Sequence, residues 1–169
     1  MTAQRSDLIY IGIYKYPINT EPLSVYIESM PIKPKFMAAS TACWRGYIAT
    51  WEIIDSKLYL IELDATTENY AKRDVNFLFP GQQKVFAEWF SGTIEALGGD
   101  LIEYHHQGYS SKYKYSYKHT FISGVLIDKE ILNNELNAKN HDLKSAESTI
   151  QKKFNLWTSF KQLKRLFKL

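Results

Sequence analysis

Residues Thr41 to Asp64 form the longest uninterrupted run of strand-favouring residues, and this stretch constrains the fold more than any other. Two apolar runs, residues 44–54 and 58–63, flank Asp55 and Ser56, which are residues typical of tight turns. The pattern predicts a β-hairpin at the structural centre of the molecule.

The register of this hairpin depends on the length of its loop, because a slip of one residue moves every side chain of a strand to the other face. A two-residue loop at Asp55–Ser56 would mix apolar and acidic side chains on one face. A three-residue loop, 55–57, separates them, and we predict this second register. It directs one set of side chains inward, namely Tyr47, Trp51, Ile53, Tyr59, Ile61 and Leu63, and leaves Thr50, Glu52 and Glu62 outside.

Length and composition indicate one globular domain, residues 1–169, because 45% of the residues are hydrophobic and only 23% are charged. The single cysteine, Cys43, excludes an internal disulfide and a cysteine zinc site, which favours a reducing compartment. The first residues lack the pattern of a signal peptide, and no apolar run approaches the length of a membrane span. We therefore predict a cytoplasmic protein without a membrane partner.

The net charge of +3 is unevenly distributed along the chain. Residues 148–169 contain no acidic residue and carry a charge of +6, whereas the remainder carries −3. Because the basic character belongs to one segment, the sequence argues against nucleic-acid binding by the whole domain. Binding of RNA through this basic tail is kept as a second alternative function.

Turn and strand signals alternate along the first 128 residues. Residues 8–14 and 23–28 predict a first hairpin, and residues 85–96 and 101–104 predict another around Gly98–Gly99. Residues 113–122 and 125–128 predict a hairpin around Ser123–Gly124. The long connection, residues 65–84, is expected to contain a short helix or a lid at Phe77–Phe79.

The predicted fold is therefore α+β. A curled antiparallel β-meander of about eight strands forms a barrel-like or strongly bent sheet in a β-rich body, residues 1–128, because a flat sheet of that length would leave long unpaired edges. Residues 129–169 favour helix and form a basic C-terminal segment.

The stretch from Tyr104 to His119 has the least ordinary composition in the chain. Strand alternation places its tyrosines on one face and its lysines on the other, whereas binding of single-stranded nucleic acid needs both in one groove. A tyrosine-rich strand flanked by lysine fits a protein interface, although a solvated edge strand would look the same. The candidate partner-binding residues are Tyr109, Lys112, Tyr113, Lys114, Tyr115, Tyr117, Lys118 and His119.

Catalytic and metal-binding patterns are weak. His105 and His106 are adjacent and point to opposite faces of a strand, so they do not share one metal ion in regular structure. We predict no catalytic residues, no metal ligands and no cofactor, and hence a protein that is not an enzyme. The alternative is an enzyme or binder for a small ligand or carbohydrate at the mouth of a barrel, using Trp51, Trp89 and Glu88.

Two segments carry a family resemblance: GYIATWEIIDSKLYLIELD at residues 46–64 and FLFPGQQKVFAEWFSGTIE at residues 77–95. They resemble a family of small, largely uncharacterised bacterial proteins with a WEI...KLYL hairpin followed by LFP and an A-x-WFSG strand. Proteins of this size and composition include cytoplasmic immunity proteins of contact-dependent growth inhibition systems. The resemblance implies a non-enzymatic protein that occludes the active site of a cognate toxin domain, often a nuclease. The basic C-terminal segment departs from this pattern.

Overall fold

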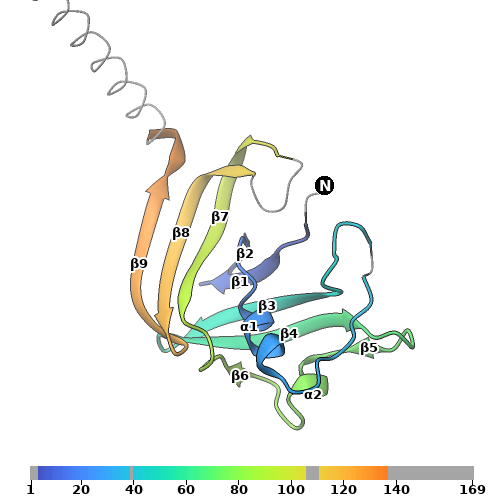
Figure 1. Cartoon of the computed structure of the whole chain (residues 1–169). Helices are drawn as coiled ribbons and strands as arrows, with labels where there is room; N and C mark the ends of the chain where they lie inside the picture. Colours follow the sequence, from blue (N-terminus) through green and yellow to red (C-terminus); the bar gives the residue numbers. More distant parts are fainter. Residues whose placement is uncertain (1–3, 39, 106–110, 137–169) are drawn as a thin grey trace, which may run out of the picture. The chain divides into compact units, whose positions relative to one another are not determined.

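The computed structural model describes residues 4–38, 40–105 and 111–136 (Figure 1). Residues 1–132 form one compact unit and residues 133–169 a second, and every described element except the end of the last strand belongs to the first. The elements are β1 (Asp7–Ile11), β2 (Tyr14–Ile18), α1 (Pro22–Ser29), β3 (Tyr47–Ile54), β4 (Lys57–Thr66), β5 (Lys72–Arg73), α2 (Val75–Leu78), β6 (Val85–Phe86), β7 (Gly92–Glu103), β8 (Lys112–Ile122) and β9 (Val125–Asn133).

All nine described strands belong to one strongly bent sheet with the order β3-β1-β2-β7-β8-β9-β4-β5, and β6 pairs with β4. Because β3 also pairs with β4, seven strands close into a ring. At two places in the ring, the neighbouring strands are paired through one pair of residues each. β2 pairs with β7 at Ile18 and Ala96, and β9 pairs with β4 at Val125 and Lys57. The predicted fold class is confirmed, and the parallel pair β1–β3 adds a connection that a pure meander lacks.

The central hairpin β3–β4 forms as predicted, but the predicted three-residue loop is wrong. Ile54 pairs with Lys57, so the loop contains only Asp55 and Ser56. Their φ angles of 48° and 60° both lie in the left-handed region, as in a type I′ turn, whose geometry matches the right-handed twist of the two strands.

A β-bulge between Thr50 and Trp51 then shifts the pairing of β3 with β4 by one residue. For this reason, neither the two-residue loop nor the three-residue loop alone predicts the side-chain orientations along the whole hairpin. Tyr47, Trp51 and Leu63 are buried as predicted, whereas Thr50, expected outside, is only 4% exposed. Ile53, Tyr59 and Ile61, expected inside, are half-buried; Glu62 is exposed as predicted, and Glu52 is half-buried.

Residues 23–28, predicted to be a strand, lie instead in α1. Pro22 stands in the first turn of this helix, where its missing N–H costs nothing, and Leu23 and Ile27 are one turn apart and both buried. The hairpin partner of β1 is β2, reached through a tight turn at Gly12 with a φ of 63°. At residues 23–28, the local alternation of apolar residues does not distinguish a strand from a helix.

Two further boundaries differ from the sequence prediction. Gly98–Gly99 does not turn the chain but lies inside β7, at an irregularity of its pairing with β8. The turn at Ser123–Gly124 is confirmed, and β9 runs on to Asn133, so the predicted boundary at residue 128 falls within a strand. The remainder of the predicted helical segment, from residue 137 onward, lies outside the described residues. The connection 65–84 contains the short helix α2.

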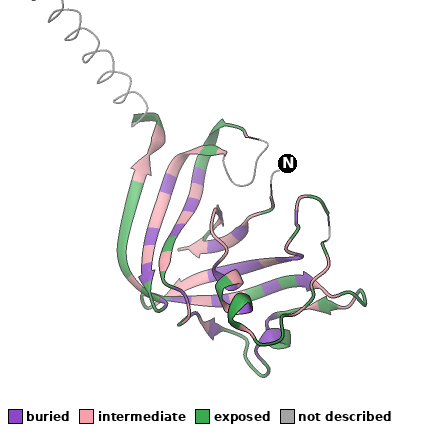
Figure 2. Ribbon diagram, viewed as in Figure 1, coloured by how far each residue is buried: buried purple, intermediate pink, exposed green. Residues whose placement is uncertain are grey.

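The core lies on one face of the sheet, and buried residues alternate along the first half of β7, at Ile94, Ala96 and Gly98 (Figure 2). Its largest fully buried residues include Trp51, Phe121, Ile9, Ile18, Leu23, Leu58, Leu60 and Ile94.

One buried charge is held within this core. The carboxylate of Asp7 accepts hydrogen bonds from Arg45 at 2.7 Å, from the Ala49 amide at 3.0 Å and from the Trp51 indole at 3.3 Å. Burial raises the pKa of Asp7, and the Arg45 guanidinium and the N–H donors oppose that rise. Arg45 also pairs with Glu21 at 3.2 Å, so this network ties β1 to the chain before β3 and to the start of α1.

Candidate functional site

The tyrosine-rich strand predicted from the sequence is β8, and its register with β7 fixes which way its side chains point. Tyr117 lies opposite Ala96 and Tyr115 opposite Gly98 on the core-side face, whereas Lys118 lies opposite Glu95 on the other face. The predicted separation of tyrosines and lysines therefore holds for Tyr115, Tyr117 and Lys118, where the register is regular.

Two tyrosines from β2 extend the tyrosines of β8. The ring centroids of Tyr16 and Tyr117 are 5.2 Å apart, and those of Tyr14 and Tyr16 are 6.5 Å apart. Burial raises the pKa of Tyr16, and the neighbouring Tyr117 raises it further. Tyr14 is 63% exposed and the other rings are half-buried. We call Tyr14, Tyr16, Tyr115 and Tyr117 the tyrosine surface.

The two glycines of β7 make room for these rings. A Cβ atom on Gly98 would lie 2.8 Å from the Tyr117 ring and 3.1 Å from the Tyr16 ring. A Cβ atom on Gly99 would lie 2.9 Å from the Tyr115 ring, and the φ of Gly99 is 76°. Because the rings pack directly against the backbone of β7, they are held in place before any partner binds. A glycine pair beside an aromatic strand is the signal that sequence analysis interpreted as a turn.

The lysines of β8 lie next to acidic or aromatic groups. Lys112 pairs with Glu103 at 2.8 Å, and the Lys114 ammonium lies 5.9 Å from the centre of the Tyr115 ring. Lys118 lines a second cavity, of 420 Å³, together with three carboxylates from Glu95, Asp128 and Glu130. This arrangement does not present a continuous basic strip of the kind that nucleic acid requires.

The other predicted partner-binding residues are spread over different environments. His119 is only 7% exposed, so it belongs to the interior and not to an accessible surface. Burial lowers its pKa, the Tyr117 carbonyl opposes this, and Lys129 lowers it further. Tyr113 is half-buried opposite Leu101, and Tyr109 lies outside the described residues.

Exposed apolar side chains also occur on β7, β8 and β9. Ile131 is 70% exposed. Five others are between 40% and 57% exposed, namely Leu101, Ile102, Ile122, Val125 and Ile127. Exposed apolar residues that lie together are typical of interaction surfaces, so these strands are a candidate for one.

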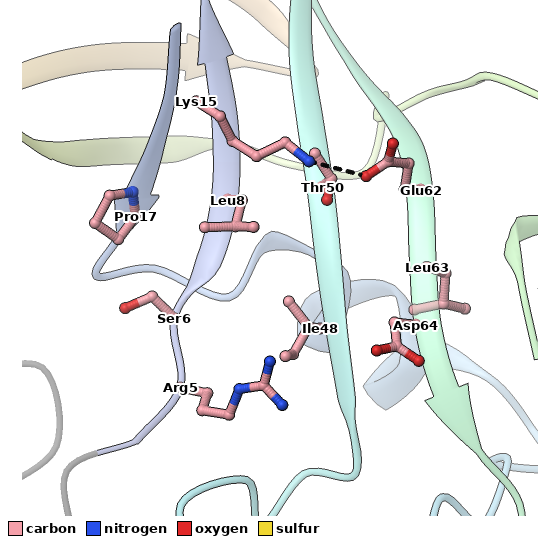
Figure 3. A pocket seen from close by; sticks show the side chains of 10 residues that line it. All are labelled: Arg5, Ser6, Leu8, Lys15, Pro17, Ile48, Thr50, Glu62, Leu63 and Asp64. Carbon is pink, nitrogen blue, oxygen red and sulfur yellow. Dashed lines mark hydrogen bonds and ion pairs between the residues drawn. The ribbon is translucent and has the colours of Figure 1, made fainter.

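A separate cleft of 610 Å³ lies outside the ring, across β2, β1, β3 and β4 (Figure 3). Lys15 reaches over Thr50 to Glu62 at 3.1 Å, and Arg5 points into the opposite end. Hydrogen bonds from Lys15 and Thr50 lower the pKa of Glu62. The lining residues are Arg5, Ser6, Leu8, Lys15, Pro17, Ile48, Thr50, Glu62, Leu63 and Asp64.

The residues predicted for a barrel mouth do not meet in this cleft. Trp51 is fully buried and bound to Asp7, and Trp89 donates to the Pro22 carbonyl at 3.1 Å while its ring stacks on Phe79. Glu88 is exposed. The two indoles therefore have structural roles in the core and around α1.

In the described part of the chain, no three His, Cys, Asp or Glu side chains converge as metal ligands do. His105 forms a pair with Glu103 at 3.0 Å on the same strand end as Lys112. Over the same residues, no helix has the length and apolar character needed to cross a bilayer. No family model, no curated protein and no solved structure matches this chain.

Proposed function

We propose that this protein is a non-enzymatic binding module that recognises another protein through the tyrosine surface and the adjoining strands β7–β9. The observation that carries the proposal is the set of tyrosine rings packed on Gly98 and Gly99, beside the exposed apolar residues of the same strands. Tyrosine gives a large contact area at low cost in side-chain entropy, and fixed rings lower that cost further.

The specific form of the proposal is an immunity protein that neutralises a bacterial toxin domain, in the cytoplasm, by occluding its active site. It is supported by the resemblance of residues 46–64 and 77–95 to small bacterial proteins and by the negative charge of residues 1–147, which carry −3. A net negative charge suits a partner whose own site is basic, as the nucleic-acid site of a nuclease is.

Co-purification of this protein from cells of its own species, followed by identification of the bound protein, tests the proposal. We expect a stoichiometric complex that withstands moderate salt and that protects cells expressing the toxin. Replacing Tyr14 and Tyr115 with serine is expected to weaken the complex by about tenfold or more, equivalent to about 1.4 kcal/mol or more.

Tyr70→Ser is the matched control, because Tyr70 is 78% exposed and lies in the β4–β5 connection, away from the tyrosine surface. Equal losses for the control and for the surface variants would contradict the proposed site. Absence of any stoichiometric protein partner in cells of the same species would contradict the function itself.

A second candidate function, small-ligand binding, is favoured by the 610 Å³ cleft, whose size lies in the range of ligand sites. Its apolar floor and its charged ends would suit a small molecule with an apolar body and an anionic group. Thermal unfolding in the presence of aromatic carboxylic acids tests this: a rise in the midpoint that Lys15→Met and Thr50→Val abolish supports it, and no rise argues against it.

A further inference from the structure

The strand β9 has an open edge. β9 is bound to β8 on one side, but on the other it meets β4 only at its start, where Val125 pairs with Lys57 and the Leu126 amide donates to Ser56 at 2.8 Å. Beyond that point β9 diverges from β4 and forms the outer border of the sheet (Figure 1). Among the described strands none pairs with this side of β9 from Ile127 onward.

The side chains along this edge are unusually accessible. Asp128 to Ile131 are all exposed, and Figure 2 shows most of β9 as exposed. Alternation along the strand places Ile127, Lys129 and Ile131 on one face and Asp128 and Glu130 on the other. The edge thus offers backbone hydrogen-bonding groups flanked on one face by two isoleucines with Lys129 between them and on the other by an acidic row, Asp128 and Glu130, to which an extended strand can add.

The charge pattern disfavours a second copy of this chain as the added strand. Antiparallel pairing that sets Ile127 opposite Ile131 of the second copy would also set Lys129 opposite its own counterpart. It would set Asp128 opposite Glu130 as well. Like charges directly opposite each other destabilise a strand pair, so the register that matches the apolar residues is the one that the charges oppose.

A basic strand fits the same edge. Asp128 and Glu130 share the 420 Å³ cavity with Glu95 and a single lysine, Lys118, so its three carboxylates are balanced by only one cation. A lysine or arginine on an added strand would reach this cavity, and an apolar residue on its other face would cover Ile127 or Ile131.

We infer that β9 binds an extended segment of a partner protein that alternates basic and apolar residues, and that this segment joins the sheet as an additional strand. The inference rests on the proposed function, because it names the part of the partner that the β7–β9 surface recognises. Backbone hydrogen bonds supply the pairing, and the acidic row selects the basic residues.

The test uses the full chain and a heptapeptide that alternates lysine and valine, with blocked ends. We expect titration calorimetry to detect binding, and hydrogen exchange to show new protection of the amides of residues 127–133. A glutamate–valine peptide of the same length is expected to bind at least tenfold more weakly. The lysine–valine peptide with N-methyl groups on one edge of its backbone is also expected to lose binding, which separates strand addition from simple charge attraction.

Asp128→Lys/Glu130→Lys is the decisive variant, since both side chains are exposed and the substitutions leave the core intact. It should reverse the preference, binding the glutamate–valine peptide more tightly than the lysine–valine peptide. Binding without new protection in β9, equal binding of the N-methylated peptide, or no binding at all would each overturn the inference. If the partner complex still forms and still depends on Tyr14, the proposed function stands while this inference fails.

Discussion

Removal of the buried carboxylate of Asp7 tests the energetic account of the fold most sharply. In Asp7→Ala, the Arg45 side chain, 11% exposed, loses its closest counter-charge, and the buried N–H groups of Ala49 and Trp51 lose their acceptor. Deleting one partner of a buried ion pair costs about 3–5 kcal/mol, which is a large part of the roughly 5–15 kcal/mol stability of a typical domain.

Urea unfolding followed by tryptophan fluorescence measures this cost. With an m-value of about 2 kcal/mol/M, the midpoint is expected to fall by about 2 M. The matched control is Asp64→Ala, because Asp64 pairs with Lys72 at 3.1 Å on the surface, where both side chains are more than 60% exposed. This control is expected to lose less than about 1 kcal/mol.

A double variant, Asp7→Ala with Arg45→Ala, isolates the interaction between the two side chains. Its loss of stability should be smaller than the sum of the losses in the two single variants. Removing Arg45 also removes the buried guanidinium that Asp7→Ala deprives of its closest carboxylate. If Asp7→Ala costs no more than Asp64→Ala, the buried network does not hold β1 against the chain before β3, and the reasoning is refuted.

Three further predictions concern the turn, the glycines and the buried histidine. Ser56→Gly is expected to stabilise the protein by about 1 kcal/mol in urea unfolding, because the φ of 60° is strained for serine and free for glycine; a loss of stability would contradict the two-residue loop. Gly98→Ala is expected to destabilise by about 1–3 kcal/mol, because its Cβ would overlap the Tyr117 ring, and Gly98, unlike Gly81 with its φ of 79°, adds no left-handed backbone strain to the loss; an unchanged stability would show that the rings do not rest on Gly98. His119 has a lowered pKa, so its contribution to stability is present above the unfolded pKa of about 6.5 and is lost as the pH falls through the lower folded value; His119→Gln should remove this part of the pH dependence of unfolding, and an unchanged pH profile would argue against a buried neutral imidazole.

The sequence reveals local features of this fold well. Alternation identifies β3, β4 and β8, and the Ser123–Gly124 turn is found from residue type alone, because glycine there has a φ of 74°. The bulge at Thr50 escapes detection because nothing local distinguishes it, and only packing in the closed ring decides the register. In α1, Leu23, Val25 and Ile27 satisfy both a strand period and, through Leu23 and Ile27, a helix period.

The sequence predicts only two of the four tyrosines of the candidate site, for a related reason. Tyr115 and Tyr117 are found because they share one strand, whereas Tyr14 and Tyr16 join them through the pairing of β2 with β7, which links residues far apart in the chain. Long-range pairing of this kind is not encoded in a local pattern. The same holds for Asp7 and Arg45, whose contact forms only when β1 packs beside β3.

Affinity capture of this protein's partner from cells of its own species tests recognition through the tyrosine surface. We expect a stoichiometric complex whose dissociation constant rises about tenfold or more in Tyr14→Ser/Tyr115→Ser and is unchanged in Tyr70→Ser. A complex that is equally strong in all three proteins would contradict recognition through the tyrosine surface.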